Sequence, residues 1–542
     1  MRQLFIIFLA VLVNPSYSQG FAQVDDHAAA EKLGSVVFTT SCDSAVRPQF
    51  NRAVALMHSF QFARAIEAFH TILASDPSCS MAYWGIALSN WGNPFAAGIK
   101  AQGQLEQGFK AAALGRAAIP KTPRERAYVE AVAHLFTDTT TIDQRSRVLG
   151  YESAMAAVSK SYPEDSEAAI FYALAVAAAA DPADKTYSRQ LKAGKILDGL
   201  YARYPDHPGL AHYIIHAYDV PSLASRAVAA ARHYSEIAPS TPHALHMPSH
   251  TFTRLGDWQS SINANIASAA SARTAGQPAE ELHASDYLEY AYLQIGQDAA
   301  AHRVRESTGE IFARFDPAEL VGGAASPAAA YFAYAAIPAR YALERQAWSE
   351  AAGLVLSPSP YPQADSITWF ARGLGAAHLK DQAAAREAIE ALKRNRDKLI
   401  AAKEPYWANQ VEIQRLEVVA WLAFVDGKSS DALVSMRAAV DLEDKTEKSA
   451  VTPGPLAPAR ELLGELFLEL RRPTEALTEF EATMAKEPNR FRAMYGAAKA
   501  AKLSGNRAKA QSYFRALLKV AENADQAGRP ELAESQKELE LK

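Results

Sequence analysis

One spacing recurs along this chain and limits what it can fold into. Near the C-terminal end, Gly464 and Ala498 are separated by the same interval as Phe480 and Phe514. A fixed period of about 34 residues predicts a repeated helical unit, with small residues where helices cross and an aromatic ring filling the gap to the next unit. We find no convincing alternation of polar and apolar residues of the kind that predicts β-strands. The sequence therefore predicts an all-α chain of stacked repeats.

The length of the period is typical of the tetratricopeptide (TPR) pair of helices. The segment Gly256-Asp257-Trp258 has the character of the turn between two paired helices, followed by a packing aromatic residue. A chain of 542 residues is too long for one compact core, whereas a solenoid grows by adding units. We therefore expect a right-handed solenoid, or superhelix, of TPR-like helix pairs.

The N-terminus differs from the rest of the chain. Arg2 precedes an apolar run from Leu4 to Val13, and the small residues of Ser16-Tyr17-Ser18 follow it. This order is typical of a secretory signal peptide, and a second cleavage site after Ala22 stays open. The apolar run is shorter than the roughly 20 residues of a membrane-spanning helix. We expect an exported protein, periplasmic or secreted, with no membrane span.

These signals divide the chain into six parts, and we expect the last to be polar and to fray. The parts are a signal peptide (1–18), an N-terminal segment (19–44), TPR-like repeats with a histidine-rich concave site (45–300), divergent helical repeats (301–450), a C-terminal TPR pair (451–522) and a polar tail (523–542).

The chain has two cysteines, Cys42 and Cys79. Their separation in the sequence is about one repeat, so they can meet between neighbouring units. In an exported protein such a pair predicts a disulfide. Two separate buried thiols, or a catalytic thiol, remain the alternatives.

Charge and motifs exclude several classes of function. The net charge of −4, with no basic run, gives no case for a nucleic-acid partner. The chain has no phosphate-binding loop, dinucleotide fingerprint, G-x-S-x-G or H-E-x-x-H motif. Arg340 and Glu344 are four residues apart, which predicts an ion pair on a helix surface. Whether the protein is an enzyme stays open.

Histidines recur in the repeat register between residues 207 and 290. His212 and His216 are four residues apart and share a helix face. His246 and His250 repeat this spacing, and each stands one repeat period after its counterpart. Because equivalent positions on stacked first helices are neighbours, we expect these four imidazoles to converge on the concave surface.

Counting positions from Gly256, taken as the turn glycine, adds further polar residues to this surface. His207 and His233 fall outside the register, and we interpret both as structural or loop residues. The count adds His243, His283 and Asp286 as nearby metal ligands, and Asp219, Tyr290 and Trp84 as ligand-binding residues. Asp219 and Asp286 can bind an ion directly or orient an imidazole.

Two kinds of site fit this pattern. Neutral imidazole is the commonest metal ligand, and two pairs on adjacent helices can complete four-coordination around one ion. The donors suit zinc, copper and iron alike, so they predict a transition metal without naming it. The alternative is a polar groove that holds a protein, a peptide or a small ligand without metal.

Several segments resemble a largely uncharacterised family of secreted bacterial TPR proteins, with motifs HPGxAHYxIHxxD and PHAxHMPSHxF. The matching segments are 76–85, 207–219, 242–252, 286–294 and 451–455. The resemblance implies a helical-repeat fold and an exported location, and it implies no established reaction. Two functions therefore stand side by side: a TPR scaffold that binds a partner in its groove, and a metalloprotein, including a metal-dependent enzyme, that uses His212, His216, His246 and His250.

Overall fold

The computed structural model describes residues 31–319, 321–526 and 528–540, and every regular element in these ranges is a helix. The all-α prediction is therefore confirmed for the described chain. The predicted signal peptide, residues 1–18, lies outside the described residues. No described helix combines the length and the apolar character that crossing a bilayer requires.

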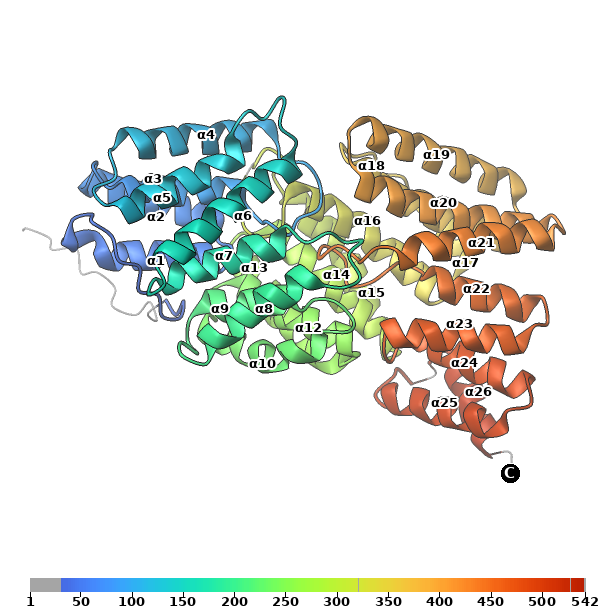
Figure 1. Cartoon of the computed structure of the whole chain (residues 1–542). Helices are drawn as coiled ribbons and strands as arrows, with labels where there is room; N and C mark the ends of the chain where they lie inside the picture. Colours follow the sequence, from blue (N-terminus) through green and yellow to red (C-terminus); the bar gives the residue numbers. More distant parts are fainter. Residues whose placement is uncertain (1–30, 320, 527, 541–542) are drawn as a thin grey trace, which may run out of the picture.

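Most helices follow one another with short connections (Figure 1). The first group is α1 Arg47–His58, α2 Phe62–Ser75, α3 Ser80–Trp91, α4 Gln102–Ala117, α5 Pro123–Ala133, α6 Gln144–Ser161, α7 Ser166–Ala178, α8 Ser188–Tyr201, α9 Pro208–Ala217 and α10 Val228–Ile237. The central group is α11 Pro242–His246, α12 Pro248–Leu255, α13 Trp258–Thr274, α14 Pro278–Gln294, α15 Asp298–Ala313, α16 Pro327–Glu344 and α17 Trp348–Ala352. The last group is α18 Pro362–His378, α19 Gln382–Ala401, α20 Pro405–Val425, α21 Ser429–Asp444, α22 Ala459–Glu469, α23 Pro473–Lys486, α24 Phe491–Leu503, α25 Arg507–Val520 and α26 Pro530–Glu540. Short 3-10 turns cover Ser44–Val46, His134–Phe136 and Ala224–Ala227.

The helices pack as sequential TPR-like pairs. Consecutive helices contact each other, and α14, α16, α18, α20 and α22 each also contact the next helix of that series. Tight packing explains the repeated small and aromatic residues, since a Cβ atom on Gly496 would lie 2.4 Å from the ring of Phe480. Gly85 has the same relation to the ring of Phe69, at 2.2 Å. The repeat therefore requires glycine where the aromatic ring of the preceding unit rests.

The predicted turn at Gly256 forms, and it also contacts the far end of the chain. Gly256 has φ +67°, and a Cβ atom there would lie 2.3 Å from the carbonyl oxygen of Pro488. The indole of Trp258 donates to the carbonyl of Asn489 at 2.9 Å. The C-terminal pairs, drawn in red in Figure 1, thus fold back onto the central helices.

Two terminal regions are held by specific contacts. A disulfide joins Cys42 to Cys79 with a Cα–Cα distance of 4.9 Å, which ties the N-terminal segment to the start of α3. The prediction of a fraying tail is wrong for residues 530–540, which form α26. Leu532 is buried there, and the guanidinium of Arg529 pairs with Asp298 at 2.7 Å. These contacts supply the buried surface and charge pairing that the tail's polar composition did not predict.

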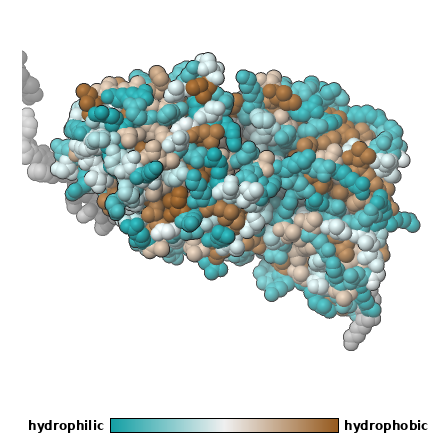
Figure 2. Space-filling view, viewed as in Figure 1, coloured by the Kyte–Doolittle hydropathy of each residue, from teal (hydrophilic) through white to brown (hydrophobic). Residues whose placement is uncertain are grey.

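The face of the molecule shown in Figure 2 is mainly hydrophilic, with scattered small hydrophobic patches. Single exposed apolar side chains, such as Val355 and Val37, are normal for a protein surface. The unusual chemistry of this chain lies inside it.

Candidate metal centre

The histidines predicted to line an open concave surface are buried instead. Six imidazoles gather between α9 and α14, and each of the six residues is at most 8% exposed. They are His212, His216, His243, His246, His250 and His283. The prediction of an open surface is wrong because loops from distant parts of the chain cover this face.

Four helices position the six rings. Helix α9 carries His212 and His216, and α14 carries His283. The segment that carries His246 and His250 is divided into α11 and α12 at Met247, since proline opens the second of them. The imidazole Nε2 atoms of His246 and His250 still lie only 3.1 Å apart.

The six rings form two groups of three, which we call triad A and triad B. Triad A comprises His212, His216 and His243; triad B comprises His246, His250 and His283. Within each triad one nitrogen from every ring lies within 4.8 Å of the others. The four imidazoles predicted to converge are therefore divided between two groups, each completed by a ring from a neighbouring helix.

Hydrogen bonds define the protonation of two rings of triad B. His246 donates from Nδ1 to the side-chain oxygen of Asn265 at 2.7 Å, because the amide nitrogen of Asn265 is already donating to the carbonyl of Ser261. His250 donates from Nδ1 to the carboxylate of Asp219 at 2.9 Å. In a neutral imidazole the second nitrogen then carries a lone pair. Two lone pairs thus face each other across 3.1 Å, an arrangement that a metal ion or a proton between them relieves.

Triad A has a similar arrangement. His212 donates from Nδ1 to the backbone carbonyl of His58 at 2.6 Å, and its Nε2 lies 3.1 Å from Nε2 of His243. The Nε2 atom of His216 is buried and has no hydrogen-bond partner among the described residues. A buried nitrogen without a partner is costly unless something binds it.

Burial favours the uncharged form of five of the six imidazoles. Desolvation lowers the pKa of His212, His216 and His246 well below the ordinary value, and neighbouring imidazoles lower it further. Desolvation also lowers the pKa of His250, and it lowers that of His283 to about 3. Neutral rings are the form that binds metal ions.

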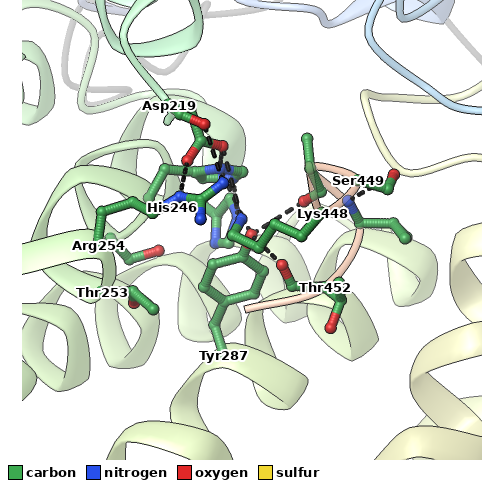
Figure 3. Close-up of polar contacts among 12 residues, drawn as sticks. Asp219, His246, Thr253, Arg254, Tyr287, Lys448, Ser449 and Thr452 are labelled. Carbon is green, nitrogen blue, oxygen red and sulfur yellow. Dashed lines mark hydrogen bonds and ion pairs between the residues drawn. The ribbon is translucent and has the colours of Figure 1, made fainter. Parts of the chain in front are cut away.

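Charged residues surround triad B (Figure 3). The second carboxylate oxygen of Asp219 accepts from Nε of Arg254 at 2.9 Å, and the ammonium of Lys448 lies 3.6 Å from Asp219. Burial lowers the pKa of Lys448 to about 8. The hydroxyl of Tyr287 donates to the carbonyl of Thr452 at 3.1 Å. Asp219 therefore orients His250 and also ties the site to residues 448–452, which precede α22.

Asp286 and Tyr290 do not join the histidines. The carboxylate of Asp286 pairs with the buried guanidinium of Arg340 at 3.1 Å. The hydroxyl of Tyr290 accepts from Arg490 at 3.2 Å. Asp286 thus joins α14 to α16, and Tyr290 holds the returning C-terminal repeats, so their positions on α14 serve tertiary packing. The predicted surface pair is also wrong, because Glu344 is buried and pairs with Arg490 at 2.6 Å.

Trp84, predicted near the concave surface, lies in the N-terminal core. Its ring is 5.3 Å from that of Phe38 and 5.3 Å from that of Phe171, and it has no exposed surface. The aromatic packing accounts for its position.

A third histidine group lies nearby. Nε2 of His58 is 2.9 Å from one oxygen of Glu167, and Nε2 of His207 is 3.0 Å from the other. Although burial favours the neutral carboxyl, the two imidazoles hold the pKa of Glu167 far below its usual value. These three could hold an ion, but hydrogen bonds already use both carboxylate oxygens. We interpret the group as a structural link between α1, α7 and α9.

A cavity of about 40 Å³ adjoins the two triads. Two rings of triad A, His216 and His243, and two of triad B, His250 and His283, face it. Its other walls come mainly from three distant segments: residues 93–97, residues 324–332 and residues 450–451.

Sequence reasoning missed Asn265, Arg254, Lys448 and Tyr287. A spacing signal existed for Arg254 and Tyr287, which stand four residues after His250 and His283 respectively. No such signal exists for Asn265, which lies on α13, or for Lys448, since only tertiary packing brings them here.

No protein-family model and no curated protein matches the chain. The solved structure of the human IFIT1 dimer with m7Gppp-AAAA is similar over 89% of this chain and 96% of that one, at 10% identity and a TM-score of 0.39. The APC/C hetero-tetramer Cut9-Hcn1 is similar over 92% of this chain and 95% of that one, at 12% identity and a TM-score of 0.30. Neither likeness bears on what this chain binds. Membership of the family of secreted TPR proteins stays a prediction.

Proposed function

We propose that this TPR-like repeat protein is a metal-binding scaffold in which triads A and B each bind one transition-metal ion. The observation that carries the proposal is the pair of facing Nε2 lone pairs on His246 and His250. Two nitrogens each about 2.05 Å from a tetrahedral ion are about 3.3 Å apart. The separation of 3.1 Å is close to this value.

The surroundings of the rings support the same proposal. Metal-binding histidines usually donate their other ring nitrogen to a carboxylate or a carbonyl group. His250 has Asp219 in this role, His246 has Asn265, and His212 has the carbonyl of His58.

We further propose that the protein is exported. The disulfide between Cys42 and Cys79 supports this, because disulfides persist in oxidising compartments such as the periplasm or the exterior. The apolar run at the N-terminus supports it from the sequence. Mass spectrometry of the secreted or periplasmic fraction, identifying the first residue of the mature chain, tests it.

Metal analysis of the full chain, purified without a polyhistidine tag, tests the metal sites. The expected result is two ions per chain after dialysis against zinc or copper. His246→Ala/His250→Ala should retain one ion, as should His212→Ala/His216→Ala. His302→Ala, which changes a partly exposed histidine on α15, is the matched control and should retain both.

A chain that stays metal-free at micromolar metal overturns the proposal. So does unchanged binding in both double variants, provided that circular dichroism shows them folded. In either case the remaining interpretation is that the protein is a TPR-like scaffold that binds a partner without metal.

A further inference from the structure

The two triads are close enough to form one centre. Between triads, the ring centroids of His216 and His250 are 5.8 Å apart, and those of His243 and His246 are 6.0 Å apart. Separations within a triad are similar, up to 6.4 Å for His250 and His283. Metal ions in two-metal sites are about 3.5–4 Å apart. Two ions in these triads would therefore be neighbours.

The cavity adjoins both triads at once. Two imidazoles from each triad line it, so a ligand inside it would reach both ions. The cavity is also small. Since one water needs about 10–15 Å³ of such space, a volume of about 40 Å³ admits a molecule of two or three heavy atoms.

The remaining walls select an uncharged occupant. They include the apolar side chains of Phe95, Phe332 and Val451 and the uncharged polar side chains of Asn93, Ser326 and Gln363. Among the described residues that line the cavity, none is an Asp, Glu, Lys or Arg. Walls of this kind favour a small uncharged molecule and offer no carboxylate to act as a general base.

The charge of the donors limits which metal ions fit the two triads. Both triads consist of imidazoles alone, and Asp219, next to His250, is already paired with Arg254 and Lys448. The other nearby carboxylate is that of Glu280, which lies 3.8 Å from Nδ1 of His243. Two divalent ions would bring four positive charges into a buried site against this one carboxylate, whereas two monovalent ions bring two. Of the metals that imidazole suits, copper combines tight binding with a stable monovalent state.

We propose that triads A and B together hold a pair of copper ions that binds dioxygen in the adjoining cavity. This inference rests on the proposed function, since it requires both metal sites. Dioxygen has two heavy atoms and no charge, so it suits both the volume and the uncharged walls of the cavity. Binding transfers one electron from each copper(I) ion to dioxygen, which becomes a bridging peroxide dianion. Two copper–oxygen bonds form, the oxygen–oxygen double bond becomes single, and no proton or further reductant is needed. The two negative charges of the peroxide offset half of the charge on the resulting copper(II) pair, and reversal releases dioxygen.

Anaerobic loading with copper(I), followed by dioxygen, tests this inference on the full chain. We expect two copper ions and an uptake of one dioxygen per chain. The oxygenated protein should show a new near-ultraviolet absorption band and almost no copper(II) signal in electron paramagnetic resonance, because the two spins are coupled. Removing dioxygen under vacuum should reverse the band.

Variants distinguish the ligands of the copper pair from the cavity wall that limits the entry of dioxygen. His216→Ala and His283→Ala remove one ligand from different triads, and each should abolish oxygen uptake. Ala97→Leu adds volume to the cavity wall from a partly exposed loop; it should keep both copper ions and lower oxygen uptake at least tenfold. Ala118→Leu, at the far end of α4, is the matched control and should behave like the parent chain.

The outcomes separate the two proposals. Two bound copper ions without oxygen uptake, or with a full copper(II) resonance signal from two isolated ions, overturn the dioxygen centre and leave the proposed function intact. Absence of bound copper and zinc overturns both. Normal uptake by His216→Ala and His283→Ala also overturns the dioxygen centre.

Discussion

Asn265 offers the sharpest test of how the metal centre is built, because it touches no metal ion itself. Its side-chain oxygen accepts from Nδ1 of His246 at 2.7 Å and so leaves Nε2 of that ring as the donor to metal. Asn265→Ala removes this acceptor. The ring can then move its proton to Nε2 or rotate, and either change weakens the site.

The expected loss follows from these contacts. Removing a group that orients a metal-binding histidine typically lowers metal affinity 10- to 100-fold, or by about 1.4–2.8 kcal/mol. The buried Nδ1–H of His246 also loses its partner, which lowers the stability of the metal-free protein by about 1–3 kcal/mol. The two effects are measured separately.

Competition titration with a chromogenic chelator measures the affinity, and urea unfolding measures the stability. The matched control is Asn395→Ala, since Asn395 is also buried on the second helix of a pair and donates to Ser366 at 3.2 Å. The control should lose a similar stability and no metal affinity. Equal metal affinity in Asn265→Ala and the parent chain would refute the assigned role of His246.

Three further perturbations test other parts of the structure. Replacing Cys42 and Cys79 by serine opens a link across 37 residues, which should lower the unfolding free energy by about 4 kcal/mol; an unchanged urea midpoint would contradict this. Asp286→Ala leaves the buried Arg340 guanidinium without its carboxylate and should cost about 3–5 kcal/mol, while Arg340→Met in the same chain should restore most of it; a change in metal stoichiometry instead would show that Asp286 belongs to the metal site. Burial lowers the pKa of His378 to about 4, so between pH 6.5 and 4 the unfolded chain takes up a proton that the folded chain does not. Stability should therefore fall as the pH is lowered through this window, by at most about 3 kcal/mol from this residue, and His378→Phe should flatten the fall; parallel urea midpoints for parent and variant across the window would refute it.

Much of the fold follows from the sequence because repeat packing is local. The repeat period, read from Gly464 and Phe480, predicts helix pairs, since each unit contacts mainly its neighbours. The same register placed His212 and His216 on one helix face. It also placed His246 and His250 in the next unit.

The sequence could not predict which rings share a site. That grouping depends on the break at Met247 and on the approach of α14, which adds His283 to triad B. The spacing of the histidines in the sequence does not say which of these rings share a triad.

Only the tertiary structure shows that the histidine-bearing face is covered. The C-terminal repeats return to the central helices through Arg490 and Asn489. Residues 448–452 then cover the histidines next to Asp219 and Tyr287. These contacts join segments far apart in the chain, so no local pattern encodes them. The sequence by itself determined the helical repeat and the supply of imidazoles. Only the folded chain removed water from those rings and placed a small cavity beside them, because burial results from long-range packing.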